Sequence, residues 1–317
     1  MDNARIRLIT FIIITGVIFG SCAPRQELHQ TLVNEIPRLV IMSAFEAELS
    51  QLRSQANIAG SYVINGRTFY VGKLSGKDVV LVLSGESMVN AAMTTQATLD
   101  HFNVYAIVFS GIAGGVNPNL NIGDVVVPAQ WGEYQEQLFA RETENGWDAG
   151  QSTTEFGNYG MMFPQYVSTT TDKQPDKEEK RFWFPVSSDM LEVAKRTGDQ
   201  VQLSNCTLVK ICLDHQPKIV VGGNGVSGST FVDNASYREW VWQTFQADSL
   251  DMESAAVAHV AYANSVPLIV FRSLSDLAGG GPGENEISTF FLLAADNSAK
   301  VVTAFLKNLP EPQTIEH

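Results

Sequence analysis

Three groups of acidic side chains stand where apolar runs end or helical patterns begin. They are Glu46 with Glu48, Asp251 with Glu253 on either side of Met252, and Asp276 behind Ser275. Carboxyl groups act as general acids and bases and accept hydrogen bonds from hydroxyl groups. In α/β sheets ligands bind beyond the carboxyl ends of the strands, so these residues are candidates for a shared site. Each also has an ordinary structural interpretation, as a solvated helix residue (Glu48), a helix N-cap (Asp251) or a turn former (Asp276).

A glycine-rich run, Ser110-Gly111-Ile112-Ala113-Gly114-Gly115, follows the apolar run Val104–Phe109. It is neither a GxGxxG motif nor a P-loop with its lysine. Two interpretations stay open: a tight turn, or a backbone that approaches a ligand closely because glycine has no side chain. The second interpretation makes Ala113 and Gly114 candidate substrate contacts.

Strands and helices must alternate along the chain to bring these residues together. We expect strands at Arg38–Ser43, Val79–Leu83, Val104–Phe109, Asp124–Val127, Thr207–Ile211, Lys218–Val221 and Pro267–Leu274, and a hairpin of Ser61–Ile64 with Thr68–Gly72 around Asn65-Gly66. We expect helices at Glu46–Ser54, Met88–His101, Ser188–Arg196, Asp233–Gln246 with Asp233 as its N-cap, Glu253–Asn264 and Ile287–Leu306. This alternation predicts one α/β domain with a mixed sheet over about residues 37–310.

The segment from about residue 132 to 181 differs from the rest, because it is polar and shows little periodicity. A long segment without regular structure in a compact domain is typical of an insertion or a functional lid. We therefore expect it to be an insertion that reshapes any nearby pocket.

Composition sets limits on the class of protein. The chain has 317 residues, 44% of them hydrophobic and 17% charged, which permits a large core and excludes wholesale disorder. Its formal net charge of −13 argues against binding to nucleic acid and against a polybasic contact with anionic lipid.

The N-terminal segment has the features of an export signal. Arg5 and Arg7 precede the apolar run Leu8–Phe19, which is too short to span a bilayer comfortably. The run ends in a sequence that resembles a bacterial lipobox at Cys22, so we expect a lipoprotein signal at 1–22 and a tether at 23–36. The protein would then be an exported periplasmic or cell-surface lipoprotein that contacts the membrane only through its lipid. The alternatives are a secreted protein cut before Pro24, a buried first helix or a short membrane anchor.

The remaining cysteines are Cys206 and Cys212. Export permits a disulfide between them, and the alternative is two unpaired buried thiols. Their spacing and the lack of a nearby histidine pair argue against a zinc site, so we expect no metal.

Five segments together resemble the superfamily of purine nucleoside phosphorylases and methylthioadenosine/adenosylhomocysteine nucleosidases. They are Ser43–Glu48, Gly111–Gly115, Asn121–Val126, Asp251–Ala256 and Arg272–Asp276. Phe182–Val186, Phe231–Arg238 and Leu277–Gly281 are similar to the plant bark-storage and nucleoside-phosphorylase-like branch. The resemblance implies a three-layer αβα fold around a twisted mixed sheet, a homo-oligomer (dimer or trimer-based), a nucleoside substrate and no cofactor.

The resemblance also implies a role for each matching residue. Asp276 would donate a proton to purine N7 with support from Ser275, and Glu48 would be the general base that positions water. Glu253 would hold the ribose hydroxyls, Met252 would lie under the sugar, and Phe231 would stack on the base. Cleavage of an N-glycosidic bond builds positive charge on the sugar and negative charge on the purine, and these groups meet both demands. The acid must stay protonated near neutral pH, so its pKa should be raised.

Two positions depart from the nucleosidase pattern, and both bear on substrate choice and rate. Ile112 stands where bacterial nucleosidases carry a serine near the attacking water, and Ala47 interrupts their acidic run.

The acceptor is expected to be water, because phosphate needs concentrated positive charge or many N–H donors. Phe109 occupies a position where phosphorylases of the superfamily carry an arginine, and Glu48 would repel the dianion. The alternative is phosphorolysis, with phosphate bound by Ser84–Ser87 and by Arg53, Arg67 or a partner's arginine. A second alternative is a non-catalytic storage or nucleoside-binding lipoprotein, which would not need an acid, a base and a ribose contact together.

Overall fold

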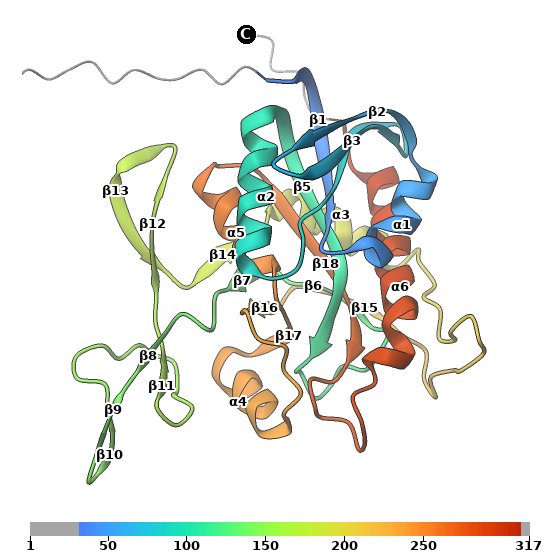
Figure 1. Ribbon diagram of the computed structural model, residues 1–317. Helices are drawn as coiled ribbons and strands as arrows, with labels where there is room; N and C mark the ends of the chain where they lie inside the picture. The colour runs from blue at the N-terminus through green and yellow to red at the C-terminus, as the bar shows by residue number, and fades with distance from the viewer. Residues whose placement is uncertain (1–31, 312–317) are drawn as a thin grey trace, which may run out of the picture. The chain divides into compact units, whose positions relative to one another are not determined.

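The computed structural model describes residues 32–311 (Figure 1). The expected signal at 1–22, the lipidation site Cys22 and most of the expected tether lie outside the described residues. The main sheet contains β1 (Asn34–Ser43), β2 (Asn57–Ile64), β3 (Arg67–Leu74), β4 (Lys77–Leu83), β5 (Phe102–Gly115), β6 (Val125–Val127), β7 (Gln130–Gly132), β14 (Trp183–Pro185), β15 (Ile219–Val221), β16 (Asn224–Ser227), β17 (Ala247–Asp251) and β18 (Leu268–Asp276). The helices are α1 (Glu46–Gln55), α2 (Met88–His101), α3 (Ser188–Gly198), α4 (Ala235–Phe245), α5 (Ser254–Ala263) and α6 (Ile287–Asn308).

The sheet is mixed, as predicted. Strand β5 is its centre and pairs with β1 and β18 in parallel and with β17 in antiparallel orientation. β4 continues the sheet parallel to β1, and β3 and β2 follow as an antiparallel meander. In Figure 1 the arrows of β5 and β18 run side by side and end at the same edge. Their carboxyl ends carry Gly111–Gly115 and Asp276, so the pairing of these two strands brings two of the candidate segments together.

Alternating side chains along β1 divide the core between the two faces of the sheet. Leu39 and Ile41 pack with buried residues of α1, α3 and α6, whereas Val40 and Met42 pack with those of α2 and α5. The predicted three-layer αβα fold is therefore confirmed. Helix α6 is long and apolar enough to cross a membrane by length and composition, but more than half of its most apolar stretch is buried, as in a core helix.

The segment 132–181 contains short strands, so the expectation of no regular structure was wrong. β8 (Gln137–Phe139) pairs with β11 (Met162–Pro164), β9 (Arg141–Thr143) with β10 (Gly146–Asp148), and β12 (Val167–Thr171) with β13 (Gln174–Arg181). The segment is held on α4 by aromatic residues: the ring centroids of Phe156 and Phe245 lie 5.1 Å apart, and the Trp240 indole N–H donates to the Gly157 carbonyl. Its polar sequence pairs backbone groups in hairpins that bury little apolar surface, which explains the weak periodicity.

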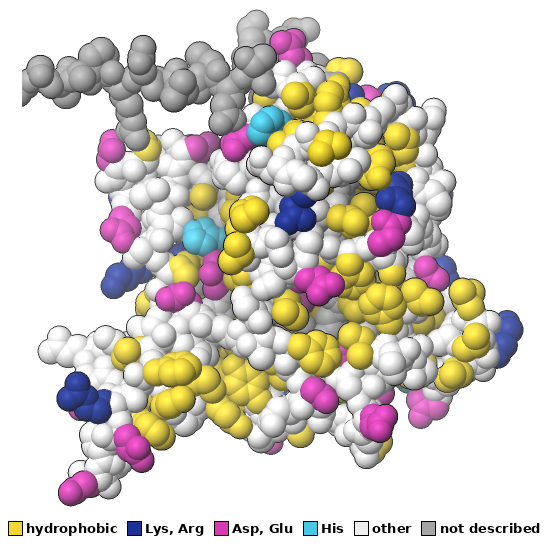
Figure 2. All heavy atoms as spheres, viewed as in Figure 1, with side chains coloured by type: hydrophobic (Ala, Val, Ile, Leu, Met, Phe, Trp, Pro, Cys, Tyr) yellow, Lys and Arg dark blue, Asp and Glu magenta, His cyan; other side chains and the backbone are white. Residues whose placement is uncertain are grey.

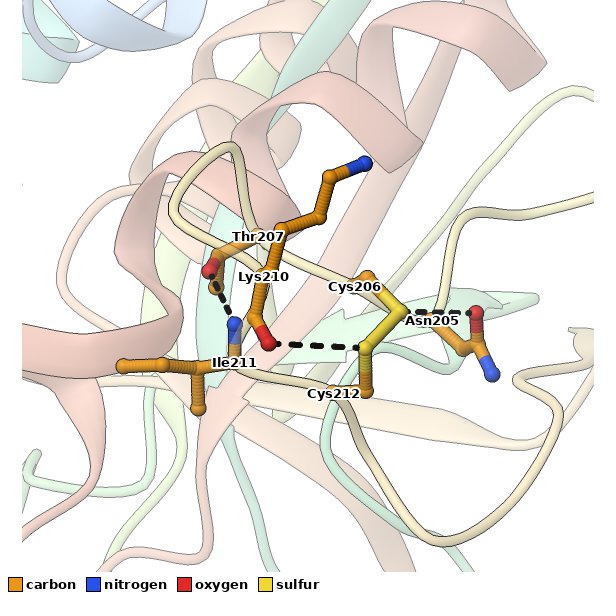
Figure 3. Close-up of a disulfide and its surroundings, with 6 residues drawn as sticks. All are labelled: Asn205, Cys206, Thr207, Lys210, Ile211 and Cys212. Carbon is orange, nitrogen blue, oxygen red and sulfur yellow. Dashed lines mark hydrogen bonds between the residues drawn. A yellow bond between two sulfur atoms is a disulfide. The ribbon is translucent and has the colours of Figure 1, made fainter.

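The strand expected at Thr207–Ile211 is absent, because these residues form a tight loop closed by a disulfide between Cys206 and Cys212 (Figure 3). The backbone N–H of Ile211 donates to the Thr207 hydroxyl, 3.1 Å away. The side chains of Leu208 and Val209 are 83% and 77% exposed. This exposed loop has the apolar composition of a buried strand. Only its position in the folded protein distinguishes it from one.

The structure also differs from the sequence-based predictions in three smaller respects. β5 extends through the glycine-rich run to Gly115, so that run is a strand and not a tight turn. The N-cap of α4 is Asn234, whose side chain accepts from the Tyr237 N–H, and not Asp233. β16 and β17 were not predicted, because they are short and about half of their residues are polar, which hides the apolar pattern of a buried strand.

Candidate active site

A cavity of about 250 Å³ opens at the carboxyl ends of β5 and β18. All of the residues proposed for catalysis and substrate binding line it, namely Glu48, Ala113, Gly114, Phe231, Met252, Glu253, Ser275 and Asp276. The two parallel strands supply Ala113, Gly114, Ser275 and Asp276, while the start of α1 supplies Glu48. The sequence analysis therefore placed distant segments in one site. Residues 132–181, all of which the structure describes, do not line the cavity.

The guanidinium of Arg272 lies fully buried against this cavity, among three carboxylates. Its Nε lies 2.7 Å from Asp251 Oδ2, its Nη1 lies 3.6 Å from Glu48 Oε1, and its Nη2 lies 3.6 Å from Glu253 Oε2. Neither Nη atom makes a hydrogen bond to a described residue. The Phe109 ring packs against the guanidinium, with its centroid 4.3 Å away. The charge of the guanidinium is therefore balanced by Glu48 and Glu253 without a hydrogen bond to either of them.

The sequence analysis assigned no role to Arg272. A signal was present, because an arginine inside the otherwise apolar run Leu268–Leu274 must be buried if that run is a central strand. A buried charge requires partners of opposite charge, which in this chain are the candidate carboxylates.

Asp251 fixes both Arg272 and the first turn of α5. Its Oδ1 accepts from the backbone N–H groups of Glu253 and Ser254 at 3.1 Å each. The hydroxyls of Ser227 and Ser254 donate to the same carboxylate. The N-cap position itself is held by Glu253, so Asp251 stabilises the start of this helix from the end of β17.

Glu48 is held by two backbone N–H groups. Its Oε1 accepts from Ile112 and its Oε2 from Ala44, both at 2.8 Å. Burial raises the pKa of Glu48 from 4.5 to about 7, although the Arg272 cation and the backbone N–H groups act in the opposite direction. A carboxyl group with this pKa can take a proton near neutral pH.

Glu253 stands on the other side of Arg272. Its Oε1 accepts from the backbone N–H of Ser87 at 2.7 Å, which ties α5 to the start of α2. Ser87 has a φ of 77°, a left-handed conformation that non-glycine residues seldom adopt and that is often found at functional sites. Burial raises the pKa of Glu253 to about 7 against the effect of Arg272.

Asp276 is the last residue of β18 and lines the same cavity as Glu48 and Glu253. Its Oδ1 accepts from the Ala278 N–H and its Oδ2 from the Ser275 hydroxyl, both at 2.8 Å. The Asn285 amide lies 3.4 Å from Oδ1 and donates also to Asp233, which holds the loop 277–286 over the site. Burial raises the pKa of Asp276, in the direction expected for an acid that stays protonated.

Gly111 lets the carboxylate and the guanidinium meet beside β5. A Cβ atom at this position would lie 1.9 Å from Arg272 Nη1 and 2.5 Å from Glu48 Oε1. The close-approach interpretation of the glycine-rich run therefore applies to Gly111, although the approaching groups belong to the protein itself.

Comparison with known proteins agrees with this geometry. Residues 38–307 match the family model of the phosphorylase superfamily. The chain belongs to this superfamily. It is 30% identical over 273 residues to a 5'-methylthioadenosine/S-adenosylhomocysteine nucleosidase of Tolumonas auensis, covering 86% of this chain and 100% of the relative. It is 27% identical over 268 residues to bark storage protein A of Populus deltoides, covering 83% and 85%.

A solved structure shows the same fold. Futalosine hydrolase of Helicobacter pylori superimposes with a TM-score of 0.66 at 20% identity, covering 86% of this chain and 99% of that chain. The family and the fold that the sequence motifs predicted are both confirmed.

We predict that Gly111→Ala lowers the free energy of unfolding by about 2–3 kcal/mol, because the methyl group would displace Arg272 and Glu48 from a packed core. Gly60→Ala is the matched control, since a Cβ there would meet nothing closer than 3.9 Å. The control should change stability by less than about 1 kcal/mol. Urea unfolding of both variants measures the difference, and equal stabilities would show that this close approach is not required.

Proposed function

We propose that this protein cleaves the N-glycosidic bond of purine nucleosides of the methylthioadenosine type, with water as the acceptor. Its relative from Tolumonas auensis bears the name of a nucleosidase for such substrates and matches nearly the whole domain. The acid, the base and the ribose contact that this reaction needs line one cavity as Asp276, Glu48 and Glu253. A storage function alone would not require these three groups in one site.

The reaction follows from the positions of these groups. Water forms a bond to C1' of the sugar while the bond from C1' to the purine breaks and its electron pair moves onto the purine. Asp276 gives its proton to the departing base, and Glu48 takes the proton that the water loses. Glu253 accepts hydrogen bonds from the ribose hydroxyls, and its negative charge favours the positive charge that develops on the ring. Phe231, about half exposed at the cavity, provides a ring face for the base.

The charge around Arg272 is the observation that supports water over phosphate. One guanidinium faces three carboxylates at 3.6 Å or less, so its positive charge is already balanced. Phosphate is a dianion near neutral pH and would meet an excess of negative charge here. The ring of Phe109, where superfamily phosphorylases carry an arginine, packs on Arg272 and adds no charge. A neutral water molecule meets no such repulsion and can donate a hydrogen bond to Glu48, which lines the cavity.

The test compares products with and without phosphate, using methylthioadenosine, adenosine and inosine. We expect free base and free sugar in phosphate-free buffer, with no increase when phosphate is added. Asp276→Asn should lower kcat/KM by about 10²-fold or more, since it removes the proton donor. Strict dependence on phosphate, with sugar 1-phosphate as the product, would establish phosphorolysis instead. Equal inactivity of the natural protein and the variant on all three nucleosides would favour a binding or storage role.

We also propose that the protein is exported and carries lipid on Cys22, as its N-terminal sequence suggests. In a bacterial host the natural protein should fractionate with membranes, and Cys22→Ser should release it. Unchanged fractionation of the variant would contradict lipid attachment.

A homo-oligomer is the final part of the proposal. Hydrophobic side chains gather over α4 and the neighbouring β8–β11 sheet on the face shown in Figure 2. Phe139 and Met161 of that region are exposed, as are Val89 and Met93 on α2. Burying such side chains against a second copy is favourable. Light scattering should give the mass of a dimer or a trimer-based assembly, and a monomer at micromolar concentration would contradict the proposal.

A further inference from the structure

Among the residues that the structure describes, every charged side chain that lines the cavity is a carboxylate. They are Glu48, Glu86, Asp251, Glu253 and Asp276. Four of them are buried and have the partners described above, whereas Glu86 is exposed. Its carboxylate makes no hydrogen bond or ion pair with residues 32–311, and its backbone carbonyl accepts from the Asn90 amide. Glu86 therefore places an uncompensated negative charge at the mouth of the site.

The position of Glu86 indicates which part of a nucleoside it faces. It precedes Ser87, whose N–H donates to Glu253 Oε1, so it belongs to the end of the cavity assigned to the ribose. In the proposed orientation the base lies towards Asp276, at the end of β18. The 5' substituent is attached to C4', next to the carbon that bears the 3' hydroxyl, so in this orientation it would lie at the same end of the cavity as Glu253 and Glu86.

Two other features of the same lining bear on charge. The rings of Phe45 and Phe291 stack with centroids 5.3 Å apart, and aromatic faces attract cations and apolar groups but not anions. Arg67 lies beside Gly85, donates to Asn90 Oδ1 at 2.7 Å and does not line the cavity. No cation in the described lining therefore offsets Glu86.

We propose that Glu86 determines substrate selectivity by charge: the site accepts nucleosides whose 5' substituent is neutral or carries an ammonium or sulfonium group, and rejects nucleoside phosphates. This inference rests on the proposed function, since it concerns the substrate of the same site. The Glu86 carboxylate is exposed to water. It attracts a cation and repels a phosphate. Its charge therefore strengthens the binding of cationic nucleosides and weakens the binding of nucleoside phosphates.

The expected size of the effect follows from Coulomb's law in a mostly aqueous environment. At a separation of roughly 8 Å each unit of charge changes affinity about twofold to threefold, and a cation and a phosphate dianion differ by three units. Removing the Glu86 charge should therefore change their relative affinity roughly tenfold. Salt should weaken the effect, because the group is exposed.

The experiment measures competitive inhibition of methylthioadenosine cleavage by two analogues at pH 7 and low ionic strength. One analogue is 5'-amino-5'-deoxyadenosine, a cation, and the other is adenosine 5'-monophosphate, an anion. The readout is the inhibition constant of the monophosphate divided by that of the amine. In Glu86→Gln this ratio should fall roughly tenfold, and 0.5 M salt should reduce the ratio of the natural protein in the same direction. Glu144→Gln is the control, because Glu144 is exposed in the β9–β10 turn and does not line the cavity, so its ratio should not change.

An unchanged ratio in Glu86→Gln, with methylthioadenosine cleaved normally by the natural protein, would overturn the role of Glu86 alone. Failure of the natural protein to cleave methylthioadenosine would overturn the proposed function. The two failures are therefore distinguished by the first measurement of the series.

Discussion

The guanidinium of Arg272, buried without access to water, has to be balanced by negative charge wherever the chain places it. The structure balances it with Asp251, Glu48 and Glu253, which come from β17, the start of α1 and the start of α5. Each of these carboxylates is held in turn by backbone N–H groups. The positions of one strand, β17, and two helices, α1 and α5, therefore depend on one ion cluster. Removing Arg272 would leave these three buried carboxylates without their cation, and breaking a buried ion pair costs several kcal/mol, about 3–5 in typical cases.

The same cluster gives the site its chemistry. Burial raises the pKa of Glu48 and Glu253 to about 7, and without Arg272 both would be raised further. The two Nη groups of the guanidinium lie 3.6 Å from Glu48 and Glu253 and make no hydrogen bond to a described residue. Phe109 and Gly111 serve this arrangement from β5, one by packing on the guanidinium and the other by leaving room for it. Structure and reactivity therefore have one physical origin, since the carboxylates that stabilise the buried cation are those that face the cavity.

Much of this could be predicted from the sequence, and the failures have physical reasons. Parallel strands end at one edge, so Gly111–Gly115 and Asp276 were predictable as neighbours once their apolar runs were identified. Arg272 could have been found from the conflict between a charge and an apolar run. The loop at Leu208 and Val209 could not have been predicted from the sequence, because a local pattern does not reveal that these apolar side chains face solvent. The hairpins within 132–181 gave no periodicity since they bury little, and Glu86 became a candidate only when the cavity defined which carboxylates lack a partner.

The pH dependence of kcat/KM reports the protonation of the free enzyme and therefore shows whether Glu48 is a base of raised pKa. Glu48 must be ionised to take a proton, so a pKa raised from 4.5 to about 7 means that activity is lost as the pH falls through about 7. Because Glu48 and Glu253 both interact with Arg272, their protonation is coupled. The acidic limb of the pH profile therefore reports the pair and not either residue alone. We expect this limb near pH 7 with methylthioadenosine, and the loss of most of the activity in Glu48→Gln. Activity that stays constant from pH 8 down to pH 5 in the natural protein would contradict the account.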